Sequence, residues 1–176
     1  FYLHFQFFVF GQTLNKQEIM QLFQDKKYSA VQSICQKIIN NGGANEFVDY
    51  YNARCSKELF LEDAYHLYAD YLDKYSYSKF IPQAHQDIAL LHFRDQDYEK
   101  AIAFFLSIDE IDQKNDLLFK LAYANFRINA FSEATYYFSK LIERNSKYTA
   151  ASRYYYAYIA YENELYKTAL NEFSKL

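Results

Sequence analysis

One spacing dominates this chain: side chains of similar size return at steps of 37, 33 and 35 residues. The clearest column is made of alanine, at Ala64, Ala101, Ala134 and Ala169. Another column of small side chains keeps the same steps and consists of Asn52, Ala89, Ala122 and Ala157. A period of about 34 residues is typical of stacked helix-turn-helix repeats, in which each repeat completes the core of its neighbours.

Four columns of bulky side chains share these steps. Their members are Tyr51, Ile88, Leu121 and Tyr156; Leu61, Tyr98, Phe131 and Tyr166; Tyr68, Phe105, Phe138 and Phe173; and Tyr71, Ile108, Leu141 and Leu176. We expect the small columns to lie where two helices approach each other most closely, and the bulky columns to fill the space between helices. An array of this kind offers a binding surface rather than a built-in catalytic pocket.

Composition favours helices throughout. The 176 residues include three Gly and one Pro, so long helices meet few breakers. Hydrophobic residues make up 51% of the chain, which is enough to form a core. The expected fold is therefore all-α: an α-solenoid of about five antiparallel helix pairs.

The pattern divides the chain into three parts. Residues 1–11 are set apart by composition, residues 12–43 are interpreted as a degenerate N-terminal helix pair, and residues 44–176 as four further pairs, the last of them truncated. The Asn-Asn-Gly-Gly run at 40–43 ends the degenerate pair, because Asn and Gly accept the left-handed backbone of a helix end. In the next pair, the second helix is expected to run from Leu59 to Lys74.

Residues Phe1 to Phe10 are apolar and aromatic and precede Gly11. Val9 and Gly11 have the spacing of the small residues at a signal-peptidase site, and a run of about ten apolar residues suits the hydrophobic part of a signal peptide. This run is too short to span a bilayer, which takes about 20 residues. We interpret residues 1–11 as a signal peptide remnant, with the end of a membrane anchor or an ordinary buried helix as alternatives. An exported protein without an integral membrane span is therefore expected.

Three stretches resemble the second helix of the tetratricopeptide repeat (TPR). They are DYEKAIAFFLSI (97–108), AFSEATYYFSKLI (130–142) and LYKTALNEFSKL (165–176). The resemblance covers about residues 14–176 and implies TPR-like units in a right-handed superhelix. The chain departs from the family in lacking Trp, in lacking the usual Pro in its linkers, and in having Asn52 where Gly or Ala is usual. With the export signal, it is similar to exported TPR proteins of the Bacteroidetes type, which implies a periplasmic or outer-membrane-associated location.

In TPR arrays the first helices of successive pairs line a concave groove that receives a partner. Helical spacing places ten residues on that face, off the packed columns. They are Leu90, Phe93 and Arg94 in the third pair, Phe119, Tyr123, Phe126 and Arg127 in the fourth, and Tyr154, Tyr158 and Tyr161 in the fifth. Because Tyr and Arg often anchor interfaces, we interpret these residues as the partner-binding groove. The alternative is that the aromatic side chains only pack against neighbouring helices.

No residue pattern indicates catalysis. The four His residues lack further ligands at metal-binding spacing, and no Ser lies in a nucleophile-elbow motif. The pair Gly42-Gly43 lacks the Lys and Ser or Thr of a phosphate-binding loop. A net charge of −3 provides no basic field for nucleic acid. We expect a protein that is not an enzyme, uses no cofactor, holds no metal and does not bind nucleic acid.

The two cysteines, Cys35 and Cys55, fall on packed faces of adjacent predicted helices. In an oxidising compartment they form a disulfide if their Cα atoms lie within about 7 Å. The alternative is a pair of buried free thiols.

These observations favour one function over two others. The leading hypothesis is a non-enzymatic scaffold of the cell envelope that binds a protein or peptide segment in the groove. The second is a carbohydrate-binding protein that stacks Tyr and Phe on sugar rings, and the third is a structural spacer for a region beyond residue 176. The lack of Trp argues against the carbohydrate hypothesis. The spacing of the repeats does not indicate whether the protein is a monomer or an oligomer.

Overall fold

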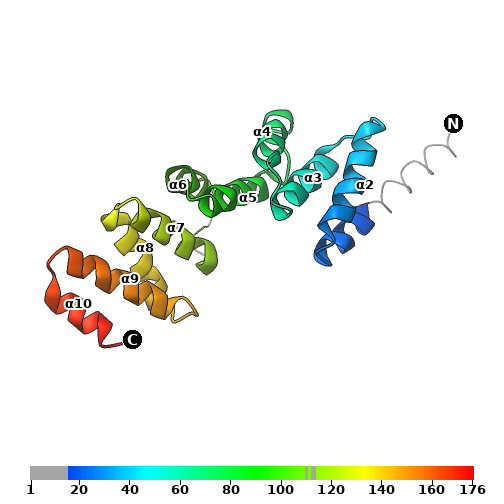
Figure 1. Cartoon of the computed structure of the whole chain (residues 1–176). Coiled ribbons are helices and arrows are strands. Elements are labelled where there is room, and N and C mark those ends of the chain that lie inside the picture. The colour runs from blue at the N-terminus through cyan, green and yellow to red at the C-terminus, as the bar shows by residue number, and fades with distance from the viewer. Residues whose placement is uncertain (1–15, 110, 112–113) are drawn as a thin grey trace. The chain divides into compact units, whose positions relative to one another are not determined.

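The computed structural model describes residues 16–109, 111 and 114–176, and all regular secondary structure in these ranges is helical (Figure 1). The expected all-α, TPR-like fold is confirmed for this part of the chain. The interpretation of residues 1–11 as a signal peptide lies outside the described residues. The chain divides into two compact units, of which unit 1 ends at Asp87 and unit 2 begins at Ile88.

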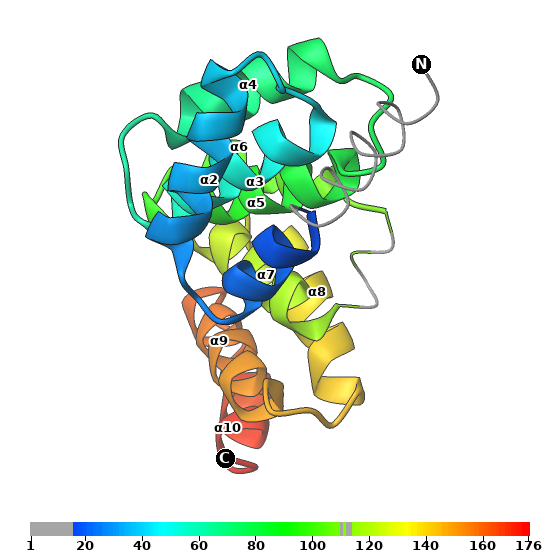
Figure 2. The same cartoon turned by 90° about the vertical axis from the view of Figure 1, so that its right-hand side faces the viewer.

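Unit 1 contains a helix over residues 16–24, followed by α2 (Tyr28–Asn40), α3 (Glu46–Glu58), α4 (Ala64–Lys74) and the start of α5 (Ile81–Arg94). Unit 2 contains the rest of α5 and then α6 (Tyr98–Leu106), α7 (Asn115–Arg127), α8 (Phe131–Glu143), α9 (Thr149–Glu162) and α10 (Tyr166–Phe173). Most helices that follow one another in the chain pack together, as α9 and α10 do in both views (Figures 1 and 2).

The turns inside the helix pairs share one backbone geometry. A residue with left-handed φ, between 58° and 62°, follows the first helix of every pair: Lys26, Phe60, Gln96, Asn129 and Glu164. The next residue donates its N–H to the carbonyl five positions back, as from Asp97 to His92 and from Ala130 to Asn125, both at 2.9 Å. This is the Schellman geometry, which ends one helix and reverses the chain. The repeat is therefore visible in the backbone as well as in the side chains.

Both columns of small side chains lie where the sequence predicts. All eight members are buried, and Asn52, at 6% exposed, is the most accessible of them. A small side chain lets two helix backbones approach closely, and a larger one would force them apart. The predicted register of the repeats is thereby confirmed.

The bulky columns depart from the prediction at two places. Leu61 is 40% exposed, because α4 begins at Ala64 rather than at Leu59 as expected. The Asp63 side chain accepts a hydrogen bond from the Ser56 hydroxyl and so ties the first turn to the end of α3. At the other end, Tyr166, Phe173 and Leu176 are exposed because no described helix packs on that side of α10.

Unit 1 contains a buried cluster of charged and polar side chains around Asp87, which is only 4% exposed. Its carboxylate accepts a hydrogen bond from the Tyr50 hydroxyl at 3.2 Å and lies 3.4 Å from Arg54 Nε. The ammonium of Lys57 also pairs with it. Burial first, and then the charge of Asp87, raise the pKa of Tyr50, so this hydroxyl stays a donor at physiological pH. The cluster connects α3 to α5 within unit 1.

Unit 2 is held by two apolar clusters. The first joins α5, α6 and α7 through Ala89, Ala101, Phe105, Ile108, Leu117 and Leu121. The second joins α7, α8 and α9 through Leu118, Ala122, Ala134, Phe138, Leu141 and Ile159. Both clusters combine alanine from the small columns with larger side chains from the bulky columns. The longest helices in the described part of the chain have 14 residues, and none is long and apolar enough to cross a membrane.

Candidate partner-binding surface

Aromatic side chains of unit 2 form a continuous row across α5, α7 and α9. The row starts at Phe93, whose ring centroid lies 5.9 Å from that of Tyr123. Tyr155 lies 5.4 Å from Tyr123 and 5.0 Å from Phe126. Tyr158 meets Phe126 at 5.7 Å in an edge-to-face arrangement. We call these five side chains, Phe93, Tyr123, Phe126, Tyr155 and Tyr158, the aromatic row.

Helical geometry explains why α7 contributes to the row. Tyr123, Phe126 and Arg127 are three and four residues apart, so they share one face of the helix. Leu121 lies on the other, core-facing side of the helix, Ala122 lies beneath Phe126, and both are fully buried. The side-chain amide of Asn125 donates to the Leu121 carbonyl at 2.8 Å and stays inside the helix pair. The same periodicity therefore builds the core and presents the row.

The members of the row are partly accessible. Phe93, Tyr123, Phe126 and Tyr155 are half-buried, and Tyr158 is 37% exposed. Phe93, Phe126 and Tyr155 pack partly against the apolar clusters of unit 2, while Tyr123 and Tyr158 contact the other rings of the row. Ring pairs at these separations are stabilised beyond their buried area. The row is therefore a surface of mutually packed rings with accessible edges.

Arg127 lies beside the row and is held in place by two tyrosines. Its guanidinium donates to the Tyr98 hydroxyl at 2.9 Å and to the Tyr123 hydroxyl at 3.1 Å. It also lies 4.9 Å from the centre of the Tyr98 ring. Its hydrogen bond to Tyr123 raises the pKa of Arg127 above its usual range, so the side chain stays cationic. An exposed charge with a fixed position is the result.

Three other arginines, Arg54, Arg94 and Arg153, are paired with carboxylates, while Arg144 donates to the amide oxygen of Asn115 at 2.8 Å. Arg94 binds its neighbour Asp95 at 2.8 Å, and Arg153 pairs with Glu172. Among the described residues Arg127 bonds only to neutral hydroxyls, and no carboxylate pairs with it. Its charge is therefore available to an anionic group from outside.

The structure places the ten predicted groove residues in different surroundings. Phe93, Phe119, Tyr123, Phe126, Arg127 and Tyr158 gather along α5, α7 and α9, although Phe119 stacks on Tyr148 at 5.1 Å and mainly supports the core. Leu90 packs against the apolar cluster of α5, α6 and α7. Tyr154 and Tyr161 turn toward α10, where they contact Phe173 and Tyr166. The binding role of the set stays a prediction.

Sequence reasoning missed two side chains of this surface, Tyr98 and Tyr155. Tyr98 belongs to a bulky column and was expected only to fill the core, yet its hydroxyl reaches Arg127. Tyr155 lies between two other tyrosines, and a stack on Phe138 at 5.3 Å turns it toward α7 and α8. Its spacing of three from Tyr158 is the signal that could have identified it.

Both thiols are free and fully buried in the structure, Cys35 on α2 and Cys55 on α3. Burial, followed by the charge of Asp49, raises the pKa of Cys35 to about 12. Burial, followed by the charge of Cys35, raises the pKa of Cys55 to about 12. Both thiols therefore stay protonated at neutral pH, and a protonated thiol is a poor nucleophile.

We expect iodoacetamide to leave both thiols of the folded protein unmodified at mildly alkaline pH. Both raised pKa values and burial prevent the reaction, and unfolding in denaturant removes both obstacles. Mass spectrometry of the intact chain before and after unfolding measures the outcome, with glutathione in the same tube as the reactive control. A chain that resists alkylation even when unfolded, and reacts only after reduction, would instead show that Cys35 and Cys55 are bridged.

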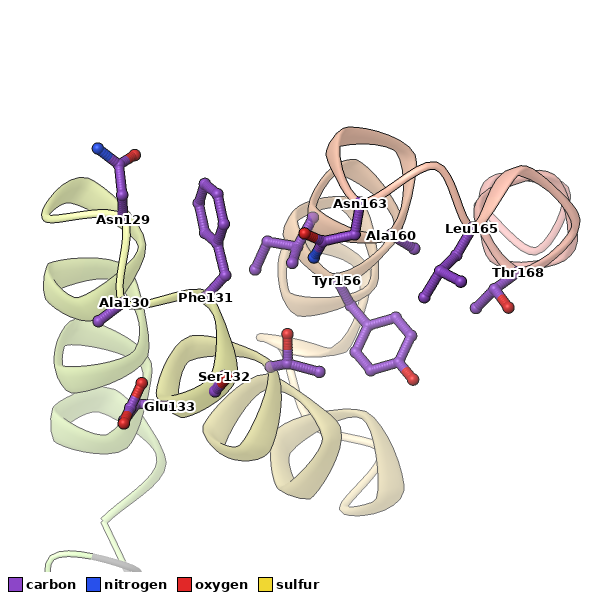
Figure 3. Close-up of a pocket in the computed structure, with 12 residues that line it drawn as sticks. Asn129, Ala130, Phe131, Ser132, Glu133, Tyr156, Ala160, Asn163, Leu165 and Thr168 are labelled. Atoms are coloured by element: carbon purple, nitrogen blue, oxygen red, sulfur yellow. The ribbon is translucent and has the colours of Figure 1, made fainter.

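A separate pocket of about 490 Å³ opens between α8, α9 and α10 in unit 2 (Figure 3). Its wall includes Ser132, Thr135, Tyr156, Asn163 and Thr168, with Glu133 as the charged residue. No member of the aromatic row lines it, and the sequence did not predict it. Among the described residues no group of three His, Cys, Asp or Glu side chains is arranged to hold a metal ion.

Comparison with known proteins supports the fold. No protein-family model matches the chain, and no curated protein matches its sequence. Among solved structures, MamA AMB-1 is similar with a TM-score of 0.78 at 14% identity, over 94% of this chain and 90% of MamA. PilF of Pseudomonas aeruginosa is similar with a TM-score of 0.64 at 14% identity, over 92% of this chain and 73% of PilF. Both are TPR-type helical repeat proteins, and the chain has the same TPR-like fold.

Proposed function

We propose that this protein is a non-enzymatic interaction scaffold that holds a segment of a partner protein on the aromatic row of unit 2. The observation that carries the proposal is the pairing of this row with Arg127, a fixed cation without a carboxylate partner among the described residues. Large aromatic side chains and arginine are the residue types that contribute most to protein interfaces. The similarity to other TPR-like proteins agrees with this class of function.

The surface favours a particular kind of segment. Apolar side chains of a partner that cover the exposed parts of the rings remove apolar surface from water and so stabilise the complex. A guanidinium binds a carboxylate through charge-assisted hydrogen bonds. Tyr98 and Tyr123 fix the position of Arg127, so little conformational entropy is lost when a carboxylate binds. The expected partner segment therefore has an Asp, a Glu or a terminal carboxylate next to aromatic or aliphatic side chains.

The proposal includes a place of action in the cell envelope, periplasmic or associated with the outer membrane. Its basis is the apolar stretch at residues 1–10 and the small residues that follow a signal-peptidase pattern. A fusion of residues 1–20, preceded by an initiator Met and the basic start of a signal peptide, to a reporter that is active only after export would test this part. An inactive reporter would contradict it without affecting the assignment of the binding surface.

We expect the double variant Tyr123→Ala/Tyr158→Ala to bind a partner segment at least tenfold more weakly than the wild type. Removal of two central rings of an interface costs about 2 kcal/mol or more. The partner is first captured from envelope extracts with the full chain, and its bound segment is then synthesised for titration calorimetry. The matched control is Tyr154→Ala/Tyr161→Ala, which removes two exposed tyrosines outside the row. Equal affinities of the two double variants would exclude the row as the binding site.

Arg127→Gln tests the charge separately. If the carboxylate of the segment pairs with Arg127, this variant and a segment with the acid changed to its amide should each bind about tenfold more weakly. Their combination should lose little more, because both changes remove the same contact. Additive losses would show that the carboxylate binds elsewhere, while the role of the aromatic row would remain.

A further inference from the structure

Asn52 is the exception in a column that otherwise contains only alanine. Its side chain is more than nine-tenths buried, and no described residue donates a hydrogen bond to its carboxamide oxygen, Oδ1. A buried polar atom without a partner destabilises the folded state. The other three repeats avoid this by having Ala at the equivalent place. Because Asn52 lowers stability where Ala would not, its oxygen is a candidate acceptor for a hydrogen bond from a ligand.

Asn52 lines a cleft of about 690 Å³ in unit 1. The cleft is enclosed by the end of α2, one face of α3 and one face of α4. Its apolar lining comes from Ile39, Leu67 and Tyr71. Its polar lining comes from Gln36, Asn40, Asp49, Asn52, Asp70, Asp73 and Lys74. The cleft thus combines a hydrophobic wall with side-chain oxygens.

The charges around the cleft are predominantly negative. Three carboxylates, of Asp49, Asp70 and Asp73, face one ammonium, of Lys74. Lys74 is already engaged, because its Nζ lies 2.9 Å from Asp49 Oδ2. Asp70 and Asp73 lie one turn apart on the exposed side of α4, and the imidazole of His66 is 3.4 Å from Asp70. A cation entering the cleft therefore meets an excess of negative charge.

We propose that this cleft binds a primary alkylammonium group, of the kind that ends a lysine side chain. An ammonium offers three N–H donors, of which one satisfies Asn52 Oδ1 and the others bind the carboxylates at the rim. The oxygen has almost no surface accessible to water in this structure, so the Asn52 side chain must turn toward the cleft when the ammonium binds. An alkyl stem fits along Ile39, Leu67 and Tyr71, as lysine stems do on apolar surfaces. The proposal is independent of the aromatic row.

Competing ligand classes match the cleft less well. An anion would be repelled by Asp70 and Asp73 and would offer no donor to Asn52. A purely apolar ligand would leave Oδ1 without a partner and would bury part of the carboxylates. A guanidinium shares the charge but presents a broad, planar group rather than a narrow tip. The combination of one hidden acceptor and an acidic rim therefore favours the ammonium.

The test uses n-pentylammonium as the probe and n-pentanol as its neutral counterpart of the same length. Both are titrated into the ¹⁵N-labelled full chain, and amide and side-chain shifts are followed by NMR. We expect saturable shifts at Asn52, Asn40 and Leu67 with the ammonium, and affinity at least tenfold weaker with the alcohol. Absence of saturable shifts at the cleft, or equal affinity for the alcohol, would overturn the proposal.

The decisive variant is Asn52→Ala, which installs the residue that the other repeats have and is therefore expected to fold. It should weaken binding of the ammonium at least tenfold and, without any probe, raise the melting midpoint by about two degrees or more. If Asn52 served only stability, its replacement by Ala would lower the melting midpoint. A higher midpoint together with weaker binding of the ammonium therefore indicates a ligand-binding role. The variant Asp70→Asn/Asp73→Asn keeps the shape and should weaken binding several-fold. Unchanged binding in Asn52→Ala would refute the site.

Discussion

Asp87→Ala is expected to lower the free energy of unfolding by about 3 kcal/mol, because removal of one partner from a buried ion pair leaves the other charge uncompensated. Asp87 is 4% exposed and pairs with both Arg54 and Lys57. This loss of stability should be at the lower end of the roughly 3–5 kcal/mol that is typical when one partner of a buried ion pair is removed. Lys57 retains a contact of 2.9 Å with Glu58, and Arg54 lies 4.2 Å from the Phe23 ring centre with a quarter of its side chain in solvent.

Thermal unfolding followed by circular dichroism measures this effect, and a loss of this size corresponds to a fall of roughly 6–12 °C for a chain of this length. The matched control is Asp95→Ala, which removes a carboxylate from an exposed pair with Arg94 and should shift the midpoint little. Hydrogen exchange should locate the damage of Asp87→Ala in α3 and α5. A change no larger than that of the control would show that the buried cluster contributes little to stability.

Ala134→Phe is expected to destabilise the chain by about 1–3 kcal/mol through overpacking. Ala134 has no exposed surface and lies among Leu118, Ala122 and Phe138 in the cluster that joins α7, α8 and α9. A phenyl ring at this place must push α7 and α8 apart or displace Phe138. Because Ala134 belongs to a column, the result also tests whether the column marks the closest approach of the two helices.

Glu133→Phe serves as the control, since it adds the same ring one position earlier, where the side chain is exposed. Denaturant unfolding should show a clear fall of the midpoint for Ala134→Phe and a small change for Glu133→Phe. Equal midpoints of the two variants would contradict the assigned packing of α8 against α7.

The fold could be predicted because it depends on the close packing of neighbouring helices, and this packing requires the small residues that recur in the columns. Only Gly, Ala or another small side chain permits two helices to pack as closely as α7 and α8 do, so this choice leaves a regular mark in the sequence. The start of α4 could not be predicted in this way. It depends on a hydrogen bond between Ser56 and Asp63, two residue types that occur in many other settings.

The candidate surface was predictable only in part. Helical spacing identifies which residues share a face, and it placed Tyr123, Phe126 and Arg127 together correctly. It does not show which of two neighbouring tyrosines faces the next helix, so Tyr155 was missed and Tyr154 was chosen. Nor does spacing reveal that Arg94 forms an ion pair with Asp95, whereas Arg127 donates hydrogen bonds only to the hydroxyls of Tyr98 and Tyr123. Both distinctions depend on three-dimensional neighbours.

The Schellman turns carry a consequence for how such proteins diverge. The bonds that close these turns join main-chain atoms, and the left-handed position holds Lys, Phe, Gln, Asn or Glu in this one chain. Evolution can therefore exchange the turn side chains without losing the architecture, provided that the few close-contact sites keep small residues.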